Sequence, residues 1–131
     1  MPMKVPAFLL RRLYVKDSLT ATADGFTFQL RNRLGSGYAR ALLPLTLDGA
    51  ELDPAASTFE VDGTSTPFTG VSEHTPFTLG MNKTTTITYA GGAIAPGPHT
   101  IGMRFEVAGL GEMGFDFTAS LGYEHPDDSV R

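Results

Sequence analysis

The sequence contains no cysteine and no tryptophan among its 131 residues. The lack of cysteine excludes disulfide bonds, thiolate metal ligands and a cysteine nucleophile, and it is typical of a reducing compartment, so we expect a cytoplasmic protein. No apolar run approaches the roughly 20 residues that a membrane helix needs, so we expect no membrane segment. We also expect no signal peptide at the start of the chain, because its short apolar stretch is followed by Arg11 and Arg12.

Charge is also sparse, and its balance is acidic. Charged residues make up 18% of the chain and the net charge is -4, which argues against a nucleic-acid partner. The basic residues crowd the first third of the chain, but strand alternation would divide them between two faces of a sheet. We therefore expect no nucleic-acid binding.

Apolar and polar residues alternate with a period of two along most of the chain. The alternation is clearest over residues 26–31, 101–107 and 115–118. Because successive side chains of a strand point to opposite faces, this pattern puts one face in a core and the other in water. The sequence therefore predicts an all-β protein, an antiparallel β-sandwich of jelly-roll-like or immunoglobulin-like type, with about eight or nine strands.

Turn-forming residues divide the chain into these strands. Asp-Gly pairs begin at residues 24, 48 and 62, and a Gly- and Pro-rich loop spans 90–99. The predicted strands lie near residues 8–15, 25–33, 38–47, 57–61, 66–70, 76–80, 83–89, 99–108 and 112–121. No long helix is expected, and residues 53–57 form at most one capped turn. We predict one sandwich domain over residues 8–121, an N-terminal extension over 1–7 and a flexible polar tail over 122–131.

The apolar stretch 39–47 breaks the alternation and contains Pro44, which cannot donate to a sheet ladder. Leu42 and Leu43 are adjacent, so in a regular strand they face opposite ways. Either a bulge turns both inward, or one of them is exposed and covered by a partner. On the second alternative the predicted protein–protein interface consists of Tyr38, Arg40, Leu42 and Leu43.

No constellation of residues indicates catalysis or metal binding. His74, His99 and His125 are scattered, have acidic neighbours only at adjacent positions, and are expected to be surface histidines. An acidic group comprising Glu51, Asp53, Glu60 and Asp62 could supply calcium ligands, although turn-forming Asp is commoner. The glycines at 109, 111 and 114 are expected to be hinges or bulges. We predict no catalytic residue and no metal site in this chain.

Two phenylalanines flank the polar segment 69–76. An arrangement of this kind lines a pocket, here with Phe68, His74 and Phe77, or packs against another subunit.

The order of several motifs is more specific than the composition. These motifs are 13–19, with Lys-Asp-Ser-Leu at its end, the Asp-Gly segments at 24–28, 45–49 and 58–63, Thr-Thr-Ile-Thr at 85–88, and Ile-Ala-Pro-Gly-Pro-His-Thr-Ile at 94–101. In order and spacing the chain resembles the small β subunits of bacterial C-glycoside deglycosidases over residues 8–121. Two departures from that family are the segment 33–38 and the proline-free end of the last strand.

The resemblance implies an accessory role. In that family the β subunit is a sandwich that associates with a larger, barrel-type subunit, which holds the divalent metal, Mn or Mg, and the acid/base residues of the lyase reaction. It implies no cofactor bound by this chain and no catalytic residue in it. Self-association and a free-standing carbohydrate-binding or adhesion module remain alternatives.

Overall fold

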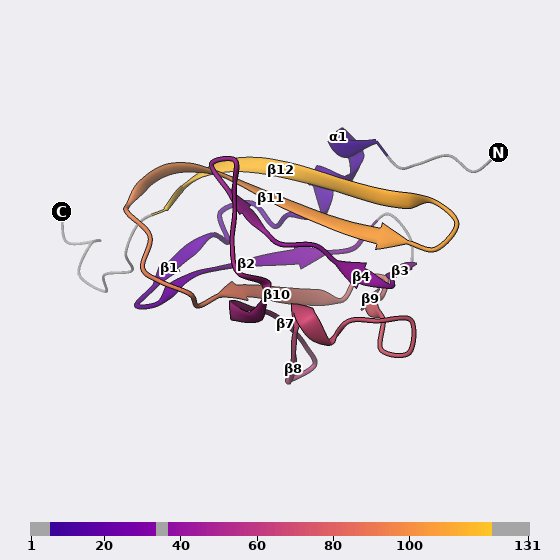
Figure 1. Cartoon of the computed structure of the whole chain (residues 1–131). Helices are drawn as coiled ribbons and strands as arrows, with labels where there is room; N and C mark the ends of the chain where they lie inside the picture. The colour runs from indigo at the N-terminus through magenta and orange to yellow at the C-terminus, as the bar shows by residue number, and fades with distance from the viewer. Residues whose placement is uncertain (1–5, 34–36, 122–131) are drawn as a thin grey trace.

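The computed structural model describes residues 6–33 and 37–121 and has an all-β sandwich architecture, as predicted. Two antiparallel sheets lie face to face (Figure 1). The first sheet has the order β1 (Thr20–Thr22), β2 (Gly25–Arg31), β10 (Thr84–Tyr89), β7 (Ser57–Val61) and β8 (Thr64–Pro67). The second has the order β12 (Gly111–Leu121), β11 (Gly97–Val107), β5 (Thr46–Leu47) and β6 (Ala50–Glu51), with β4 (Ala41–Leu42) also paired to β11. A separate pair joins β3 (Gly37–Ala39) to β9 (Phe77–Leu79).

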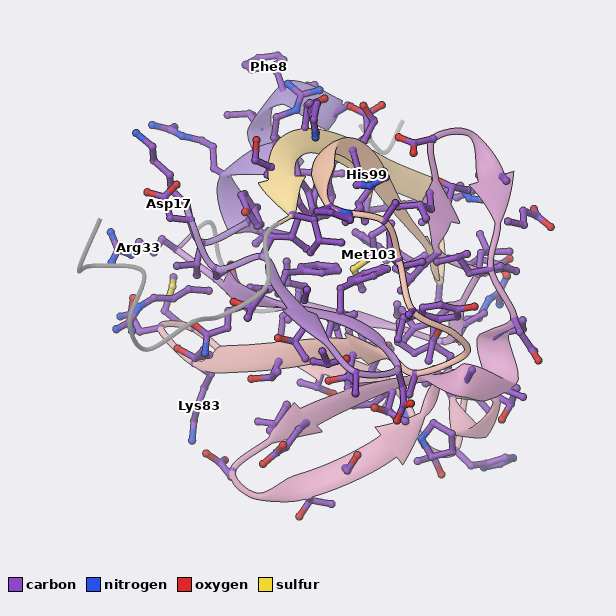
Figure 2. All side chains as sticks on the ribbon, turned by 90° about the vertical axis from the view of Figure 1, so that its left-hand side faces the viewer. Phe8, Asp17, Arg33, Lys83, His99 and Met103 are labelled. Carbon is purple, nitrogen blue, oxygen red and sulfur yellow. The ribbon has the colours of Figure 1, made fainter. Side chains whose placement is uncertain are left out.

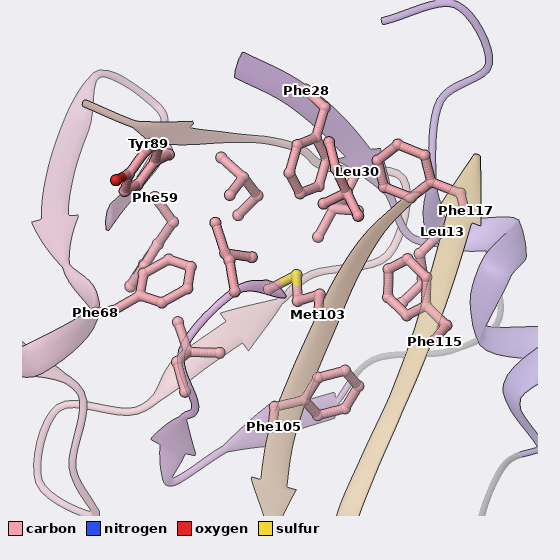
Figure 3. Packing of buried hydrophobic residues seen from close by; sticks show 14 of the residues in the cluster. Leu13, Phe28, Leu30, Phe59, Phe68, Tyr89, Met103, Phe105, Phe115 and Phe117 are labelled. Atoms are coloured by element: carbon pink, nitrogen blue, oxygen red, sulfur yellow. The ribbon is translucent and has the colours of Figure 1, made fainter. Parts of the chain in front are cut away.

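The core lies between the two sheets and follows the predicted alternation. The inward residues predicted from the alternation are all buried, namely Phe26, Phe28, Leu30, Ile87, Ile101, Met103, Phe105, Phe115 and Phe117. The ring of Phe28 from the first sheet meets that of Phe117 from the second edge to face, with centroids 5.1 Å apart (Figure 3). Burial of this apolar surface is the main force that holds the layers together.

The N-terminal segment is helical, so the strand predicted over residues 8–15 is wrong. Residues Ala7–Leu10 form α1, and Arg11–Leu13 continue it as the 3-10 turn η1. The helix buries Leu10 and Leu13, which are three residues apart and therefore share one helical face. This segment lies against β12 (Figure 1), where Arg11 Nε donates a hydrogen bond of 2.6 Å to the carbonyl oxygen of Asp116. It thereby covers the outer edge of the second sheet.

Several other elements differ from the prediction. The strand expected over 38–47 is divided into β3, β4 and β5, and the one expected over 66–70 gives way to β8 followed by the 3-10 turn η3 (Phe68–Gly70). Strands β1 and β6 were not predicted, because each has only two or three residues. The capped turn expected over 53–57 is present as η2 (Pro54–Ala56), in which the Asp53 carboxylate accepts from the Ala55 N–H at 2.9 Å. The predicted extension and tail lie almost wholly outside the described residues.

The apolar stretch 39–47 contains a β-bulge, but this bulge does not turn both Leu42 and Leu43 inward as the first alternative expected. Arg40 N–H donates to the Glu106 carbonyl at 2.9 Å, and Leu43 N–H donates to the Arg104 carbonyl at 3.1 Å. The chain thus advances three residues from 40 to 43 while β11 advances two, and the extra residue is accommodated by a bulge. Leu42 points inward opposite Phe105 and is 8% exposed, whereas Leu43 is half-buried.

Candidate functional site

The four residues of the predicted interface do not form a continuous apolar patch. Tyr38 on β3 is 57% exposed, but Leu42 belongs to the core. The Arg40 guanidinium pairs with Glu106 at 2.9 Å and with Glu73 at 3.2 Å. The hydrogen bond and charge of Glu106, followed by those of Glu73, raise the pKa of Arg40. Arg40 therefore ties the loop after η3 to β11, and only the Tyr38 ring is left well exposed in this group.

The predicted pocket residues are also separated by the fold. Phe68 and Phe77 are 2% and 1% exposed and contribute to the core. The Phe77 ring meets that of Phe59 edge to face, with centroids 4.8 Å apart. His74 is exposed in the loop between η3 and β9. In the described part of the chain the three side chains therefore do not line one cavity.

The structure instead shows a shallow hollow on the outer face of the second sheet. Its volume is about 270 Å³, and it is lined by Ala7, Thr46, Gly102, Arg104, Gly114, Phe115 and Asp116. Gly102 and Gly114 point outward on adjacent strands, where a Cβ atom at either would collide with neighbouring atoms. Gly114 lies within β12, so its expected role as a hinge or bulge is wrong. Neighbouring atoms, including those of Thr46 and Arg104, therefore approach the backbone closely at these two glycines.

Two ion pairs fix the charged walls of this hollow. Arg104 Nη2 donates to Glu51 Oε2 at 3.0 Å and to the Pro44 carbonyl at 3.2 Å. Arg11 Nη2 lies 3.4 Å from Asp116 Oδ1. Both pairs are partly exposed, so each contributes little to stability but helps to orient the side chains at the rim.

An exposed aromatic side chain follows a lining residue of the hollow in the sequence. Phe8 follows Ala7 directly on α1 and is 65% exposed, the largest fraction among the large hydrophobic side chains of the described residues. Figure 2 shows Phe8 projecting from α1, away from the body of the protein. Sequence reasoning missed this feature because residue 8 was assigned to a strand. The three-residue spacing of Leu10 and Leu13 is the feature of the sequence that indicates a helix here.

His99 lies near the protein surface, as predicted for the histidines, but its ring is held by two hydrogen bonds. Its side chain is only 14% exposed, with Nδ1 2.6 Å from Asp48 Oδ2 and Nε2 2.7 Å from the Ala95 carbonyl oxygen. The hydrogen bond to Asp48, and then the one to Ala95, raise the pKa of His99. The hydrogen bond from the Thr100 N–H, and then the one from His99, lower the pKa of Asp48. The pairing of β5 with β11 brings these residues together across the sequence.

No group of three or more histidine, cysteine or acidic side chains that could hold a metal ion occurs within residues 6–33 and 37–121. Two aspartates of the Asp-Gly pairs serve in turns, since Asp48 and Asp62 both have φ of 53°. Within the same ranges no helix is long and apolar enough to cross a membrane.

Comparison with known proteins corrects the family prediction. A family model described as hydroxymethylglutaryl-CoA reductase, N-terminal domain, matches residues 9–122, and no curated protein matches the chain. The assignment to C-glycoside deglycosidase β subunits is therefore wrong. Its motifs were Asp-Gly and Pro-Gly turns, which suit hairpins in any antiparallel sandwich and do not distinguish families. With most of its length matched, the chain belongs to the family of hydroxymethylglutaryl-CoA reductase N-terminal domains.

Proposed function

We propose that this chain is a non-catalytic β-sandwich module that docks onto a larger enzyme, and that a hydroxymethylglutaryl-CoA reductase is the partner to test first. The family match over residues 9–122 is the observation that carries this proposal. The family is described as the N-terminal domain of hydroxymethylglutaryl-CoA reductase, which supports a reductase as the partner. The matched range includes both sheets and the second half of α1, which makes the whole sandwich the unit that would dock.

The surface around α1 is the docking face that best fits this role. It includes the projecting Phe8 ring and the hollow of about 270 Å³, to which the preceding residue Ala7 contributes. An exposed aromatic side chain can insert into a partner, and a depression can accept a side chain of the partner. Aromatic residues dominate the binding energy of many interfaces. Burial of this ring against a partner would remove its apolar surface from water, which is favourable.

The charges near this surface support the same assignment. The Arg104–Glu51 and Arg11–Asp116 pairs lie beside the hollow, and all four side chains are partly exposed. An apolar centre with a polar, hydrated rim is the usual anatomy of a protein–protein interface. We call the surface formed by Phe8, the hollow and these two pairs the α1 face.

The edge around Tyr38 remains a second candidate surface for docking. Tyr38 is the next most exposed large hydrophobic side chain in the described residues, and Arg40 lies two positions along the chain. The inward position of Leu42 leaves this edge with less apolar area than the sequence predicted. It therefore ranks below the α1 face.

Size-exclusion chromatography with light scattering tests the proposal. The purified chain is mixed with the hydroxymethylglutaryl-CoA reductase encoded in the same genome, and a complex of the summed mass is expected. Phe8→Asp should abolish the complex if the α1 face docks, and Tyr38→Asp should do so if the other edge docks. Met81→Asp is the matched control, since Met81 is also exposed but lies in the β9–β10 turn. Circular dichroism checks that each variant folds. Elution of the wild-type chain apart from the reductase at every concentration would refute the proposal.

A further inference from the structure

The two ring nitrogens of His99 each face a hydrogen-bond acceptor. Nδ1 faces the Asp48 carboxylate and Nε2 faces the Ala95 carbonyl oxygen, at 2.6 and 2.7 Å. Neither acceptor can donate a proton when Asp48 is ionised, and a neutral imidazole has only one N–H. Only the doubly protonated imidazolium can therefore make both hydrogen bonds.

The two hydrogen bonds differ in how well other contacts support them. Asp48 stays attached to β11 without His99, because its N–H donates to the Thr100 carbonyl at 2.7 Å and its Oδ1 accepts from the Thr100 N–H at 2.9 Å. The Ala95 carbonyl accepts no other hydrogen bond from the described residues. Ala95 belongs to the connection 90–96, which leads from β10 in one sheet to β11 in the other. The His99 ring is thus a tie on the second half of this connection, while Gly92 N–H ties the first half to the Asp24 carbonyl at 2.7 Å.

We propose that His99 is a proton-controlled latch that holds the connection 90–96 against β11 when it is protonated and releases it when it is neutral. On loss of one proton, the remaining N–H stays with the Asp48 carboxylate, because hydrogen bonds to charged acceptors are the stronger ones. The bare Nε2 lone pair then faces the Ala95 oxygen, and the two acceptors repel each other. The second half of the connection moves away from the ring, while its first half remains held at Gly92.

The surroundings of His99 leave Asp48 as the one charged group that faces it from the described residues. The β5–β6 turn supplies Asp48, β12 supplies Ala119 as the register partner, and the connection supplies the Ala95 carbonyl. The His99 side chain is 14% exposed, so the ring remains in contact with solvent (Figure 2 labels its position). Its pKa lies above the ordinary value of 6.5, so the latch opens on the alkaline side of that value.

Nuclear magnetic resonance of the full chain across a pH titration tests the latch. The imidazole ¹⁵N shifts report the protonation state of His99, and ¹⁵N relaxation of the Ala95 amide reports mobility. The order parameter of Ala95 should fall from about 0.85 to below about 0.6 as His99 loses its proton, whereas residues in the middle of β11 should not change. Asp48→Asn should move the His99 titration and the loop transition together to lower pH. His74→Gln, which alters an exposed histidine, is the control and should behave like the wild type.

In His99→Gln, the mobility of the connection 90–96 should no longer depend on pH between about 5.5 and 8.5. This is the range in which histidine titrates. An Ala95 amide equally rigid above and below the His99 titration in the wild-type chain would overturn the proposal. So would a pH-dependent transition that persists in His99→Gln. If that variant does not fold, the wild-type and Asp48→Asn titrations decide the question alone. The wild-type result does not depend on the proposed docking.

Discussion

The ring of Tyr14 stacks on the ring of Phe117 with centroids 3.8 Å apart and an interplanar angle of 13°. Tyr14 follows η1 and also forms an isolated bridge with Leu30 on β2, so the residue links the first sheet to β12 of the second. The N-terminal segment thereby closes one side of the sandwich. Its anchoring depends on packing more than on charge, because the Arg11–Asp116 pair is largely exposed.

Two substitutions at Tyr14 separate packing from hydrogen bonding. The Tyr14 hydroxyl is buried and has no hydrogen-bond partner among the described residues. Tyr14→Phe should therefore leave the free energy of unfolding unchanged or raise it by up to about 1 kcal/mol, because an unsatisfied polar group is removed. Tyr14→Ala should lower it by about 2–4 kcal/mol through loss of the stacked ring. Urea unfolding measures both, and a loss above about 1 kcal/mol for Tyr14→Phe would show that the hydroxyl is bonded after all.

Phe105 tests the register of the core. It is 6% exposed and lies between Leu42 on β4 and Met113 on β12. Phe105→Ala should reduce the free energy of unfolding by about 3–5 kcal/mol because of the cavity that it leaves. Phe8→Ala is the matched control, since Phe8 is 65% exposed, and its effect should stay within about 0.5 kcal/mol. A loss below about 1 kcal/mol for Phe105→Ala would place that ring outside the core.

Gly25 is required by a close approach of two strands. A Cβ atom at this position would overlap the carbonyl oxygen of Tyr89 on β10. Gly25→Ala should therefore destabilise the fold by roughly 1–3 kcal/mol or more, as overpacking does. Gly37→Ala is the control, because a Cβ atom there would meet no heavy atom within 4 Å beyond its chain neighbours, and it should change stability by less than about 0.5 kcal/mol. Thermal unfolding of the two variants measures the difference, and equal effects would contradict the observed pairing of β2 and β10.

The Asp48–His99 pair predicts the pH dependence of stability. The pKa of His99 is raised above 6.5, so its contribution is complete below pH 6.5 and is lost as the pH rises through the folded-state pKa. The pKa of Asp48 is lowered below 3.8, so its contribution is present above pH 3.8 and is lost as the pH falls through its folded-state pKa. The pair therefore stabilises the protein most between these two values. Urea unfolding of the wild type and of His99→Gln checks this, and identical pH profiles would contradict it.

Local pattern was sufficient to predict the strands that form the core. The alternation at Phe26 and Phe28, and again at Ile101 and Met103, is visible from neighbouring residues alone. Because the apolar side chains are the ones that become buried, the alternation also predicts which side chains face the core. The segment around Leu10 shows where this reasoning fails. Its short apolar run is compatible with a strand or a helix, and packing against β12 settles the choice.

The candidate sites could not be predicted because they arise from register. Asp48 and His99 are 51 positions apart and meet only when β5 pairs with β11. Gly102 and Gly114 both line the hollow because the β11–β12 hairpin places them on the same face of adjacent strands. Neither the Asp48–His99 pair nor the hollow can be recognised from residues that are close in the sequence. The turn motifs can be recognised in this way, but unrelated sandwiches share them.

Isothermal titration calorimetry of the chain with the hydroxymethylglutaryl-CoA reductase of the same genome measures the proposed docking itself. The wild-type chain and Met81→Asp should bind with the same affinity, and Phe8→Asp should bind at least about tenfold more weakly, as expected for a central aromatic contact. Absence of binding by the wild-type chain, at concentrations where it is shown to be folded, would contradict the account. Equal affinity of the wild type and Phe8→Asp would show that the α1 face is not the docking surface.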